Sequence, residues 1–580
     1  MLGLYKYTKS YSRAILGSAG VVIKEQVSGN SAQAADGGLA DDSDSQSSVV
    51  LETASLISCV TCLSDNMDSH STDPLLLPSN MVIPYAKILN ARLAQETHSE
   101  SGADDSFAEG TGSVRTADSS PKPGSSALRG RAETGLKNGG VLVDIVFAKP
   151  RRNDLVPKTV TLFIEYASDD FYGGGEADVV EEILRRSYKN TKRNKSILVI
   201  INPYGGKGKA HKLYVTKAKP ILVASDCHLD VVETKYTSHA SEIAATVDIN
   251  KYDVIACASG DGIPHEVLNG LFGRPDRVAA FNKIAITQLP CGSGNAMSIS
   301  CHGTSNPSYA SLSLVKATEA RVDLMCCTQP SYASSPRVSF LSQTYGVIAE
   351  SDINTEFMRW IGPARFELGV TLNIFQRRKY PCQLYVKYAA KTKNELREHY
   401  TLHKARITQS FRSELMDSAS HLGDLSSTIS DTIDDSCFQL KWSLDEPIPQ
   451  DWEEIDASLT DNLGIFYVGK MPYIAPDAKF FPAALHDDGA MDMVITDART
   501  PLTRIAPILL SLDKGSHVLQ PEVEHSKIEA YRLIPKLKSS IISVDGENFP
   551  FEPIQVEVLP RLAKTLLKNG CYVETEFEAL

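Results

Sequence analysis

The chain has 580 residues, more than one hydrophobic core normally organises, so we expect two domains with additional segments. Its net charge of −12 argues against nucleic-acid binding, because recognition of a phosphate backbone requires a basic face. No apolar run approaches the roughly 20 residues that span a bilayer, and no secretory signal is visible. Eleven cysteines, an odd number scattered along the chain, predict reduced thiols in the cytoplasm.

Residues 1–135 are predicted to form a mostly disordered extension, because this stretch is largely rich in Ser, Asp, Ala and Gly and poor in aromatic residues. A short apolar island within it carries Cys59 and Cys62. The sequence shows neither the further ligands of a zinc site nor the strand and helix that flank a redox pair. Reversible palmitoylation, which would attach the protein to a membrane, and two unmodified thiols remain as alternatives.

Residues 136–192 predict a small β-rich element, with alternating apolar segments at Val141–Phe147 and Thr159–Tyr166. From 193 to 325 the chain repeats a strand, a turn and a helix, and three of the turns are rich in glycine. This repeat indicates a parallel α/β sheet, whose ligands bind at the carboxyl ends of the strands. Residues 326–580 have short strands separated by turn residues, which predicts an antiparallel β domain with a disordered insert at about 391–440.

The first glycine-rich turn, Asn202–Lys209, has the sequence NPYGGKGK. It matches neither the phosphate loop GxxxxGK[ST] nor the dinucleotide fingerprint GxGxxG. Glycines between a strand and a helix nevertheless allow backbone N–H groups to approach an anion, and the lysines add positive charge. Phosphate binding and an ordinary glycine turn both fit this pattern.

The second turn, Ser259–Gly262, places Asp261 between two glycines at the end of an apolar strand. The structural interpretation is a helix N-cap. The functional one is a general base that takes the proton of an alcohol as it attacks a γ-phosphate, since phosphoryl transfer depends mainly on positioning and charge neutralisation. The third turn, Gly292–Asn295, also joins a strand to a helix, so we expect the three turns to converge at one edge of the sheet.

Four segments carry a recognisable pattern: INPYGGKGKA, SGDGIPHEVLNGL, LPCGSGNAMS and YGVIAESDINTEFMRWIGPARF. In order and approximate spacing they resemble the diacylglycerol-kinase-like catalytic fold and, within it, the sphingosine kinases. The resemblance covers Lys195–Arg378 strongly and Leu463–Pro560 more sparsely. The N-terminal extension, β-rich element and insert look more like the fungal sphingoid long-chain base kinases than the short animal enzymes. The resemblance implies a nucleotide-binding α/β domain, a lipid-binding antiparallel β-sandwich, and the cofactors ATP and Mg²⁺.

The resemblance also implies site residues, with Asp261 as the catalytic base. The implied ATP contacts are Asn202, Pro203, Tyr204, Thr234, Lys235, Tyr236, Thr237, Ser238, Glu266, Gly292, Ser293, Gly294, Arg359, Arg365, Asp545, Gly546 and Glu547. The implied substrate contacts are Ser259, Gly260, Asp261, Gly262, Ser342 and Asp352. On its own, Asp545–Glu547 would be interpreted as a hairpin turn. Glu350 stands where the family usually has an acidic residue two positions before Asp352, and it keeps the charge.

A protonated amine that enters an apolar channel must be paired with a negative group. By its resemblance to the sphingosine kinases, Asp352 matches the family's residue with this role. Ceramide and diacylglycerol carry no such cation, so sphingoid bases fit better. A ceramide or diacylglycerol kinase on the same fold is one alternative, and an inactive nucleotide-binding membrane scaffold is another. His265, which follows the catalytic turn, is interpreted as structural.

The implied location is the cytoplasm, with peripheral attachment to the endoplasmic reticulum, Golgi or plasma membrane. The implied partners are the sphingoid base and a membrane surface. The sequence leaves homodimer formation and the side chains that ligate Mg²⁺ open.

Overall fold

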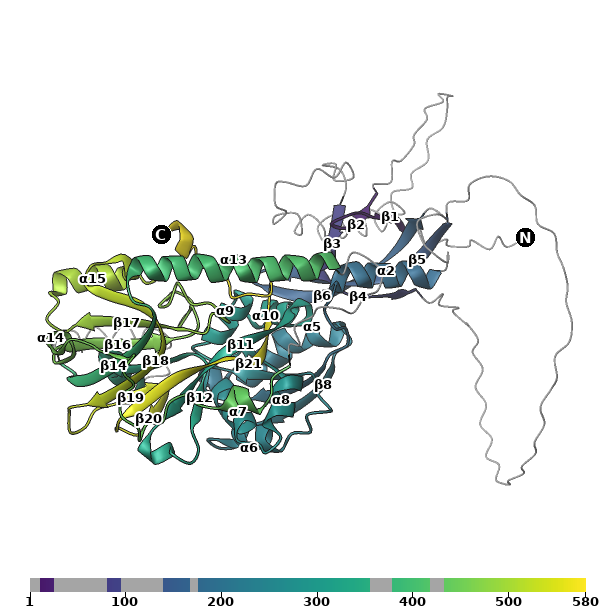
Figure 1. Cartoon of the computed structure of the whole chain (residues 1–580). Coiled ribbons are helices and arrows are strands. Elements are labelled where there is room, and N and C mark those ends of the chain that lie inside the picture. Colours follow the sequence, from purple (N-terminus) through teal and green to yellow (C-terminus); the bar gives the residue numbers. More distant parts are fainter. Residues whose placement is uncertain (1–10, 25–80, 95–138, 167–175, 355–377, 418–431) are drawn as a thin grey trace, which may run out of the picture. The chain divides into compact units, whose positions relative to one another are not determined.

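The computed structural model describes residues 11–24, 81–94, 139–166, 176–354, 378–417 and 432–580 (Figure 1). Contacts between residues divide the chain into two units. The first comprises Met1–Tyr85, Ala91–Ile145 and Thr159–Arg185, and the second comprises Ala86–Asn90, Val146–Lys158 and Arg186–Leu580.

A six-stranded sheet with the order β3-β2-β1-β6-β5-β4 is built from the N-terminal part of the chain. Its strands are β1 (Ser12–Leu16), β2 (Gly20–Ile23), β3 (Met81–Pro84), β4 (Ile88–Leu93), β5 (Gly139–Arg151) and β6 (Asp154–Tyr166), followed by helix α2 (Glu176–Tyr188). The two predicted strands within β5 and β6 are confirmed. The prediction of a mostly disordered extension over 1–135 missed four strands. They are short apolar runs, and β2 is buried at every position, but the polar composition around them hides the signal.

The expected parallel α/β fold is present in the second unit. Strands β7 (Ser196–Ile201), β8 (His228–Glu233), β9 (Val254–Ser259) and β10 (Ala285–Pro290) run parallel in the order β10-β9-β7-β8. Every residue of β9 and β10 is buried, as expected for strands covered on both faces. The helices of this part are α3 (Gly205–Gly208), α4 (Ala210–Leu213), η3 (Tyr214–Ala218), α5 (Lys219–Ala224), α6 (His239–Thr246), α7 (Gly262–Phe272), α8 (Arg277–Lys283), α9 (Ala296–His302) and α10 (Pro307–Lys316).

An antiparallel β domain follows. Its strands are β11 (Thr318–Thr328), β12 (Arg337–Ser339), β13 (Ser342–Gly346), β14 (Cys382–Ala390), β15 (Glu453–Glu454), β16 (Leu463–Gly469), β17 (Met491–Asp497), β18 (Val523–Pro535), β19 (Ile542–Val544), β20 (Glu547–Phe549) and β21 (Ile554–Leu567). Strand β21 pairs with β10 in parallel, with Ala285 opposite Lys564, and with β18 and β11 in antiparallel fashion. The two halves of this unit therefore share one 15-stranded sheet.

The insert expected to be disordered at about 391–440 contains a long helix, α13 (Lys393–Asp417), seen along the upper edge of this unit in Figure 1. Its residues Leu396, Tyr400 and Ile407 are buried in a cluster with Phe577 of the C-terminus. Charged and polar residues dominate the sequence of this helix, so composition alone predicted disorder. The three buried side chains pack the helix against the rest of the unit. The remaining helices are η2 (Tyr85–Lys87), η4 (Pro330–Tyr332), α11 (Val347–Asn354), η6 (Asp435–Phe438), α14 (Ala457–Thr460), α15 (Leu502–Leu510), η7 (Ser516–Leu519) and η8 (Phe577–Ala579).

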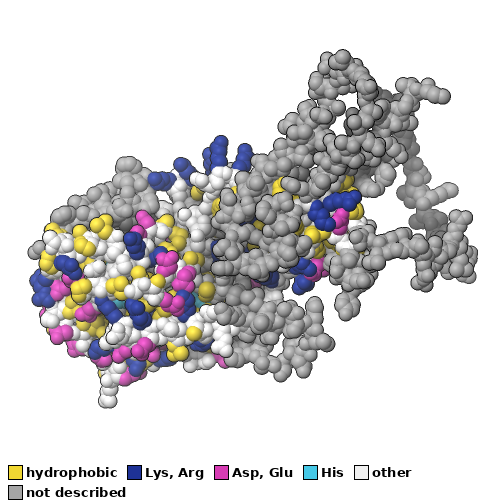
Figure 2. All heavy atoms as spheres, turned by 90° about the horizontal axis from the view of Figure 1, so that it is seen from above, with side chains coloured by type: hydrophobic (Ala, Val, Ile, Leu, Met, Phe, Trp, Pro, Cys, Tyr) yellow, Lys and Arg dark blue, Asp and Glu magenta, His cyan; other side chains and the backbone are white. Residues whose placement is uncertain are grey.

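Basic and acidic side chains are interspersed on the face shown in Figure 2. Among the described residues, no helix combines the length and the apolar character that a membrane crossing requires. The nine cysteines that the structure describes are free thiols. Cys59 and Cys62 lie outside the described residues.

Candidate active site

Three glycine-rich turns meet at the carboxyl ends of neighbouring strands, since β9 lies between β7 and β10. A Cβ atom on Gly206 would come within 2.2 Å of the carbonyl oxygen of Cys291, and one on Gly292 would come within 2.2 Å of the Cα atom of Gly260. No side chain can be placed at such distances, so backbone packs on backbone at both contacts. The predicted convergence of the turns is confirmed.

The first turn is tightly coiled. Residues 206–208 adopt left-handed φ angles between 57° and 73°. The Oδ1 atom of Asn202 accepts a hydrogen bond from the backbone N–H of Tyr204 (3.0 Å), which fixes the start of the turn. The side chains of Lys207 and Lys209 are exposed. This turn therefore combines a tight loop with two accessible positive charges.

Asp261 is half-buried and turned toward the third glycine turn. Its Oδ1 atom accepts hydrogen bonds from Nε2 of Gln288 (3.1 Å) and the backbone N–H of Met297 (3.2 Å), and its Oδ2 atom accepts one from the N–H of Ala296 (3.0 Å). Burial raises the pKa of Asp261, and these hydrogen bonds oppose the rise. Asp261 occupies the N-cap position of α7 but makes no capping hydrogen bond to that helix. The N-cap interpretation therefore does not explain its side chain.

The corner between β19 and β20 reaches the second turn. Asp545 and Gly546 adopt left-handed φ angles of 52° and 86°. The next residue, Glu547, is exposed, and its Oε1 atom would lie 3.2 Å from a Cβ atom on Gly262. The structure thus places the carboxylate of Glu547 beside the turn that carries Asp261.

The side chain of Asp545, in contrast, is buried among the protein's own donors. Its Oδ1 atom accepts a hydrogen bond from the hydroxyl of Ser339 (2.6 Å), and its two oxygens accept the backbone N–H groups of residues 340–342. Its Oδ2 atom lies 2.8 Å from Nδ1 of His265. Asp545 therefore joins α7 to the segment before β13 through His265, in keeping with the structural interpretation of that histidine.

The segment Thr234–Ser238 leads from β8 into α6. The backbone N–H of Lys235 donates to Nδ1 of His239 (3.1 Å), and the N–H of Ala240 donates to Oε2 of Glu266 (3.0 Å). Because Glu266 lies on α7, this contact joins α7 to the start of α6, directly after the predicted segment Thr234–Ser238.

Two residues from the predicted substrate region are buried. The hydroxyl of Ser342 lies 3.3 Å from the hydroxyl of Tyr467. Glu350 accepts hydrogen bonds from Arg378 (2.6 Å) and from the hydroxyl of Tyr380 (2.9 Å), so its charge is paired within the protein.

The structure describes only some of the remaining predicted site residues. The hydroxyl of Ser259 is buried and donates to the carbonyl oxygen of Gly260 (2.7 Å). Asp352 lies in α11, but its side chain is not among the described parts. Arg359 and Arg365 lie outside the described residues.

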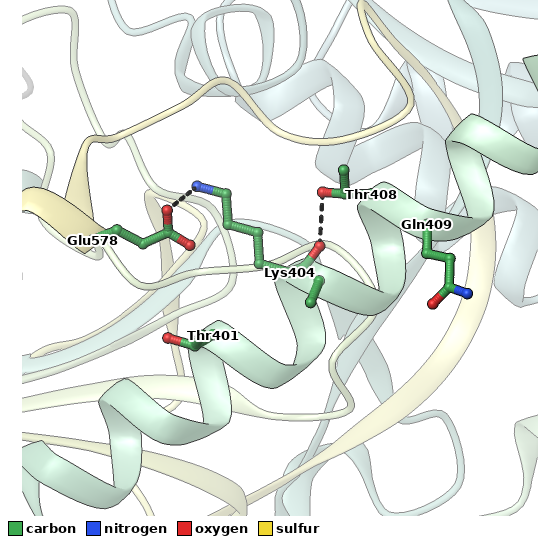
Figure 3. A pocket seen from close by; sticks show the side chains of 6 residues that line it. Thr401, Lys404, Thr408, Gln409 and Glu578 are labelled. Carbon is green, nitrogen blue, oxygen red and sulfur yellow. Dashed lines mark hydrogen bonds and ion pairs between the residues drawn. The ribbon is translucent and has the colours of Figure 1, made fainter.

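A shallow groove lies elsewhere, between α13 and the C-terminus (Figure 3). It is lined by Thr401, Lys404, Ala405, Thr408, Gln409 and Glu578. Lys404 pairs with Glu574 (2.7 Å) and Glu578 (3.3 Å), which anchors the C-terminus to the helix. The groove contains none of the predicted site residues.

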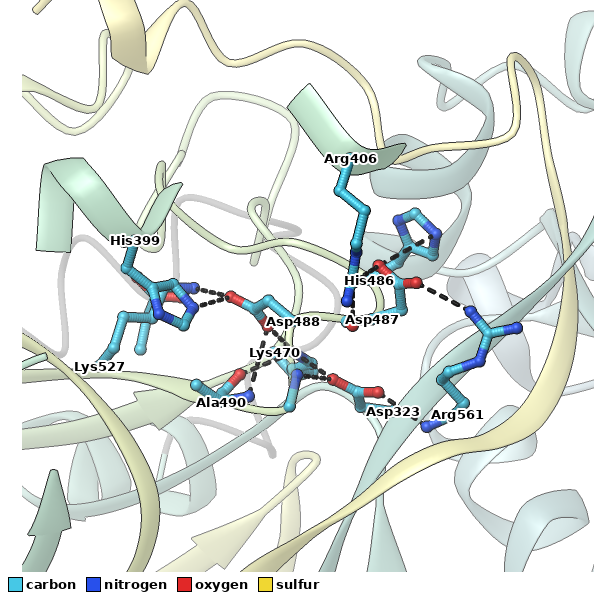
Figure 4. A network of polar contacts seen from close by, with 12 residues as sticks. Asp323, His399, Arg406, Lys470, His486, Asp487, Asp488, Ala490, Lys527 and Arg561 are labelled. Atoms are coloured by element: carbon cyan, nitrogen blue, oxygen red, sulfur yellow. Dashed lines mark hydrogen bonds and ion pairs between the residues drawn. The ribbon is translucent and has the colours of Figure 1, made fainter. Parts of the chain in front are cut away.

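A buried network of charges stabilises the β domain (Figure 4). Lys470 lies 2.7 Å from Asp323 and also contacts Asp488, while Lys527 lies 2.8 Å from Asp488. Burial alone would raise the pKa of Asp488, but the two lysines hold it well below its usual value. His399 of α13 reaches the same carboxylate at 3.2 Å. The described residues contain no group of His, Cys, Asp or Glu side chains suited to hold a metal ion.

Two residues at the site were not predicted. Gln288 contacts Asp261, and Asn295 closes the third turn by accepting from the N–H of Gly292 (3.0 Å) and donating to its carbonyl oxygen (3.0 Å). A glutamine within the apolar strand ITQLP was the available signal for Gln288.

Residues 196–327 match the diacylglycerol kinase catalytic domain family, and residues 456–567 match the YegS C-terminal NAD kinase beta sandwich-like domain. The chain thus combines a diacylglycerol kinase catalytic domain with a C-terminal β-sandwich-like domain. A crystal structure of a diacylglycerol kinase from Bacillus anthracis str. Sterne aligns with a TM-score of 0.40 and 16% identity, over 65% of this chain and 98% of that chain.

The chain is 53% identical to sphingoid long chain base kinase 5 of Saccharomyces cerevisiae, over 92% of this chain and 89% of that protein. It is 32% identical to sphingoid long chain base kinase 4 of Schizosaccharomyces pombe, over 67% and 78%. Human sphingosine kinase 1 is 26% identical over 63% of this chain and 88% of its own. The chain therefore belongs to the sphingoid long-chain base kinase family, and its greater coverage by the budding yeast relative fits the fungal type.

Proposed function

We propose that this protein transfers the γ-phosphoryl group of ATP to the primary hydroxyl of a sphingoid long-chain base such as sphingosine, dihydrosphingosine or phytosphingosine. The observation that carries the proposal is the half-buried carboxylate of Asp261 at the point where three glycine turns meet. Asp261 accepts the hydroxyl proton while the substrate oxygen bonds to the γ-phosphorus. The bond from that phosphorus to the bridging oxygen breaks, and ADP leaves with the electron pair.

The ATP phosphates would lie over the converging turns, where Asn202–Tyr204, Gly292–Gly294 and the exposed lysines of the first turn can approach them. The nucleoside would lie toward Thr234–Ser238, which leads into the start of α6, where the backbone N–H of Ala240 donates to Glu266. Arg359 and Arg365 would neutralise the charge that develops on the transferred group.

A Mg²⁺ ion would be held here in part by the carboxylate of Glu547, which is exposed and lies beside the turn of Asp261. Bound there with the nucleotide, the ion would offset the charge of the triphosphate. Since the described residues provide no complete set of protein ligands, nucleotide oxygens and water would supply most of its coordination.

Asp352 would pair with the protonated amine of the substrate, and Ser342 would provide a second polar contact. The hydrocarbon tail would then lie toward the apolar cluster beyond Ser342. Tyr467, whose hydroxyl faces Ser342, packs its ring against Phe480 (4.7 Å between centroids) and Phe481 (5.1 Å).

A kinase for such lipids must reach a membrane, and acylation of Cys59 and Cys62 would attach this one peripherally. The endoplasmic reticulum, Golgi and plasma membrane are the candidate surfaces, and a homodimer is compatible with this arrangement. Incorporation of a labelled palmitate analogue into the wild-type chain, and its loss from a variant with both cysteines changed to serine, tests the attachment.

The experiment that tests the reaction incubates the purified chain and its Asp261→Asn variant with labelled ATP and a panel of sphingosine, phytosphingosine, ceramide and diacylglycerol. We expect phosphorylation of the sphingoid bases alone, and a decrease of about 10²–10⁴-fold in the variant with ATP binding retained. Preference for a neutral lipid would support the alternative kinase. Absence of turnover with intact ATP binding in the wild-type chain would support the inactive scaffold.

A further inference from the structure

Gln288 is a buried polar side chain in a buried strand, and it contacts Asp261. Its exposed fraction is 0%. Its Oε1 atom accepts a hydrogen bond from the backbone N–H of Ser298 (2.8 Å), and its Nε2 atom donates to Oδ1 of Asp261 (3.1 Å). Nε2 also lies 3.4 Å from the carbonyl oxygen of Ser259. Gln288 therefore connects the second glycine turn to the helix that follows the third.

The orientation of this amide is fixed by its partners. A backbone N–H group can only donate, so the atom of Gln288 that faces Ser298 must be the oxygen. The nitrogen consequently faces Asp261, and it can only donate. It follows that Oδ1 of Asp261 must accept at this contact.

The other partners of Asp261 impose the same condition. The backbone N–H groups of Ala296 and Met297 also can only donate, so three donors converge on the two carboxylate oxygens. Two acidic residues lie on the neighbouring corner: Asp545, whose negative charge favours protonation of Asp261, and Glu547, whose Oε1 atom would lie 3.2 Å from a Cβ atom on Gly262. In the described part of the chain, no lysine or arginine hydrogen-bonds to Asp261. The negative charge of Asp261 is therefore stabilised by neutral hydrogen-bond donors.

We propose that Gln288 is a positioning residue for phosphoryl transfer, whose amide keeps Asp261 ionised and directs the unused lone pairs of that carboxylate. This inference rests on the proposed function, in which Asp261 accepts the substrate proton. Gln288 does not touch the reacting atoms and acts through Asp261.

The test measures kcat/KM for sphingosine against pH, at saturating ATP and Mg²⁺, for wild type, Gln288→Met and Thr287→Val. Methionine has a similar length but cannot donate, so protonation of Asp261 becomes easier and the acidic limb of the profile moves up by about one pH unit. Thr287 is the matched control, because it is also fully buried on β10 and its hydroxyl bonds His302 (2.7 Å) rather than Asp261. Its variant loses a buried hydrogen bond without moving the limb. Ionisations of ATP are common to all three proteins and cancel.

Gln288→Glu is the second variant, in case the methionine variant does not fold. It keeps the side-chain length and the acceptor for Ser298, but it brings a second carboxyl group to Asp261. Two such groups share a proton, so the pH profile gains an ionisation that the wild type lacks. If the acidic limbs of the kcat/KM profiles of both Gln288 variants coincided with that of the wild type, the inference would be overturned. The proposed function would remain intact. Normal turnover of Asp261→Asn would instead overturn the proposed function itself.

Discussion

The Nδ1 atom of His265 lies 2.8 Å from Oδ2 of Asp545, and this contact ties the first turn of α7 to the corner between β19 and β20. The helix begins directly after Asp261, and the corner continues directly into Glu547. One buried hydrogen bond thus connects the helix that follows Asp261 to the corner that precedes Glu547.

Replacing Asp545 by asparagine should destabilise the protein by about 3 kcal/mol, because an amide nitrogen would then face donors that now have an acceptor. Urea unfolding followed by circular dichroism measures the change. Glu547→Gln is the matched control. Since Glu547 is exposed, its variant should unfold within about 0.5 kcal/mol of wild type while turnover falls. An Asp545→Asn protein as stable as wild type would show that the buried contacts are unimportant.

Gly292→Ala should lower kcat/KM for ATP by about 10²-fold or more, because the new methyl group would overlap Gly260 and push the second and third turns apart. Steady-state kinetics at varied ATP measures this effect. Gly273→Ala is the control, since a Cβ atom there would meet its nearest neighbour at an ordinary 3.6 Å. Equal kinetics for the two variants would argue against close packing of the turns.

The pH dependence of wild-type activity should reflect the raised pKa of Asp261. A carboxyl group with a raised pKa takes up its proton at a higher pH than an exposed aspartate, which titrates near 4. A base must be unprotonated, so kcat/KM should fall as the pH drops through this raised value, at a higher pH than an exposed aspartate would give. An acidic limb at or below about pH 4 would contradict the assignment.

Asp352→Asn should raise the KM for the sphingoid base far more than the KM for ATP, because only the lipid carries an amine to be paired. Initial rates with each substrate varied in turn give both constants. In the control, Glu350→Gln, the change should mainly reduce stability, since the charge of Glu350 is already paired with Arg378. Equal increases of both KM values for Asp352→Asn would exclude the amine contact.

Lys470→Met should destabilise the β domain by about 3–5 kcal/mol, because Asp323 and Asp488 would remain buried with their main cation removed. Chemical unfolding measures the loss. Lys404→Met removes a lysine whose partners Glu574 and Glu578 are about half exposed, and should cost about 1 kcal/mol or less. If both variants lost a similar free energy of unfolding, burial would not explain how much each lysine contributes.

The converging turns could be predicted because each is a local pattern: a strand, a few glycines and a helix. Parallel strands bring such turns to one edge of a sheet whatever their order. Gln288 escaped prediction because its partners lie 27 residues before it and 10 residues after it, and no local rule connects them.

Strands β1 to β4 and helix α13 could not be predicted for a related reason. Strands β2 and β3 pair across a long polar stretch, as in Gly20 opposite Pro84, and neither would be stable alone. The pairing of β10 with β21 likewise joins Ala285 to Lys564, which are far apart in the sequence. Contacts between residues that are far apart in the sequence determine the structure of segments whose composition and periodicity are uninformative.

The parallel pairing of β10 with β21 also restricts how a lipid can enter. A hinge motion that separates the α/β half from the β-sandwich would have to break these backbone hydrogen bonds and those between β21 and β11. The continuous sheet therefore acts as a fixed frame that holds the glycine turns and the sandwich strands together.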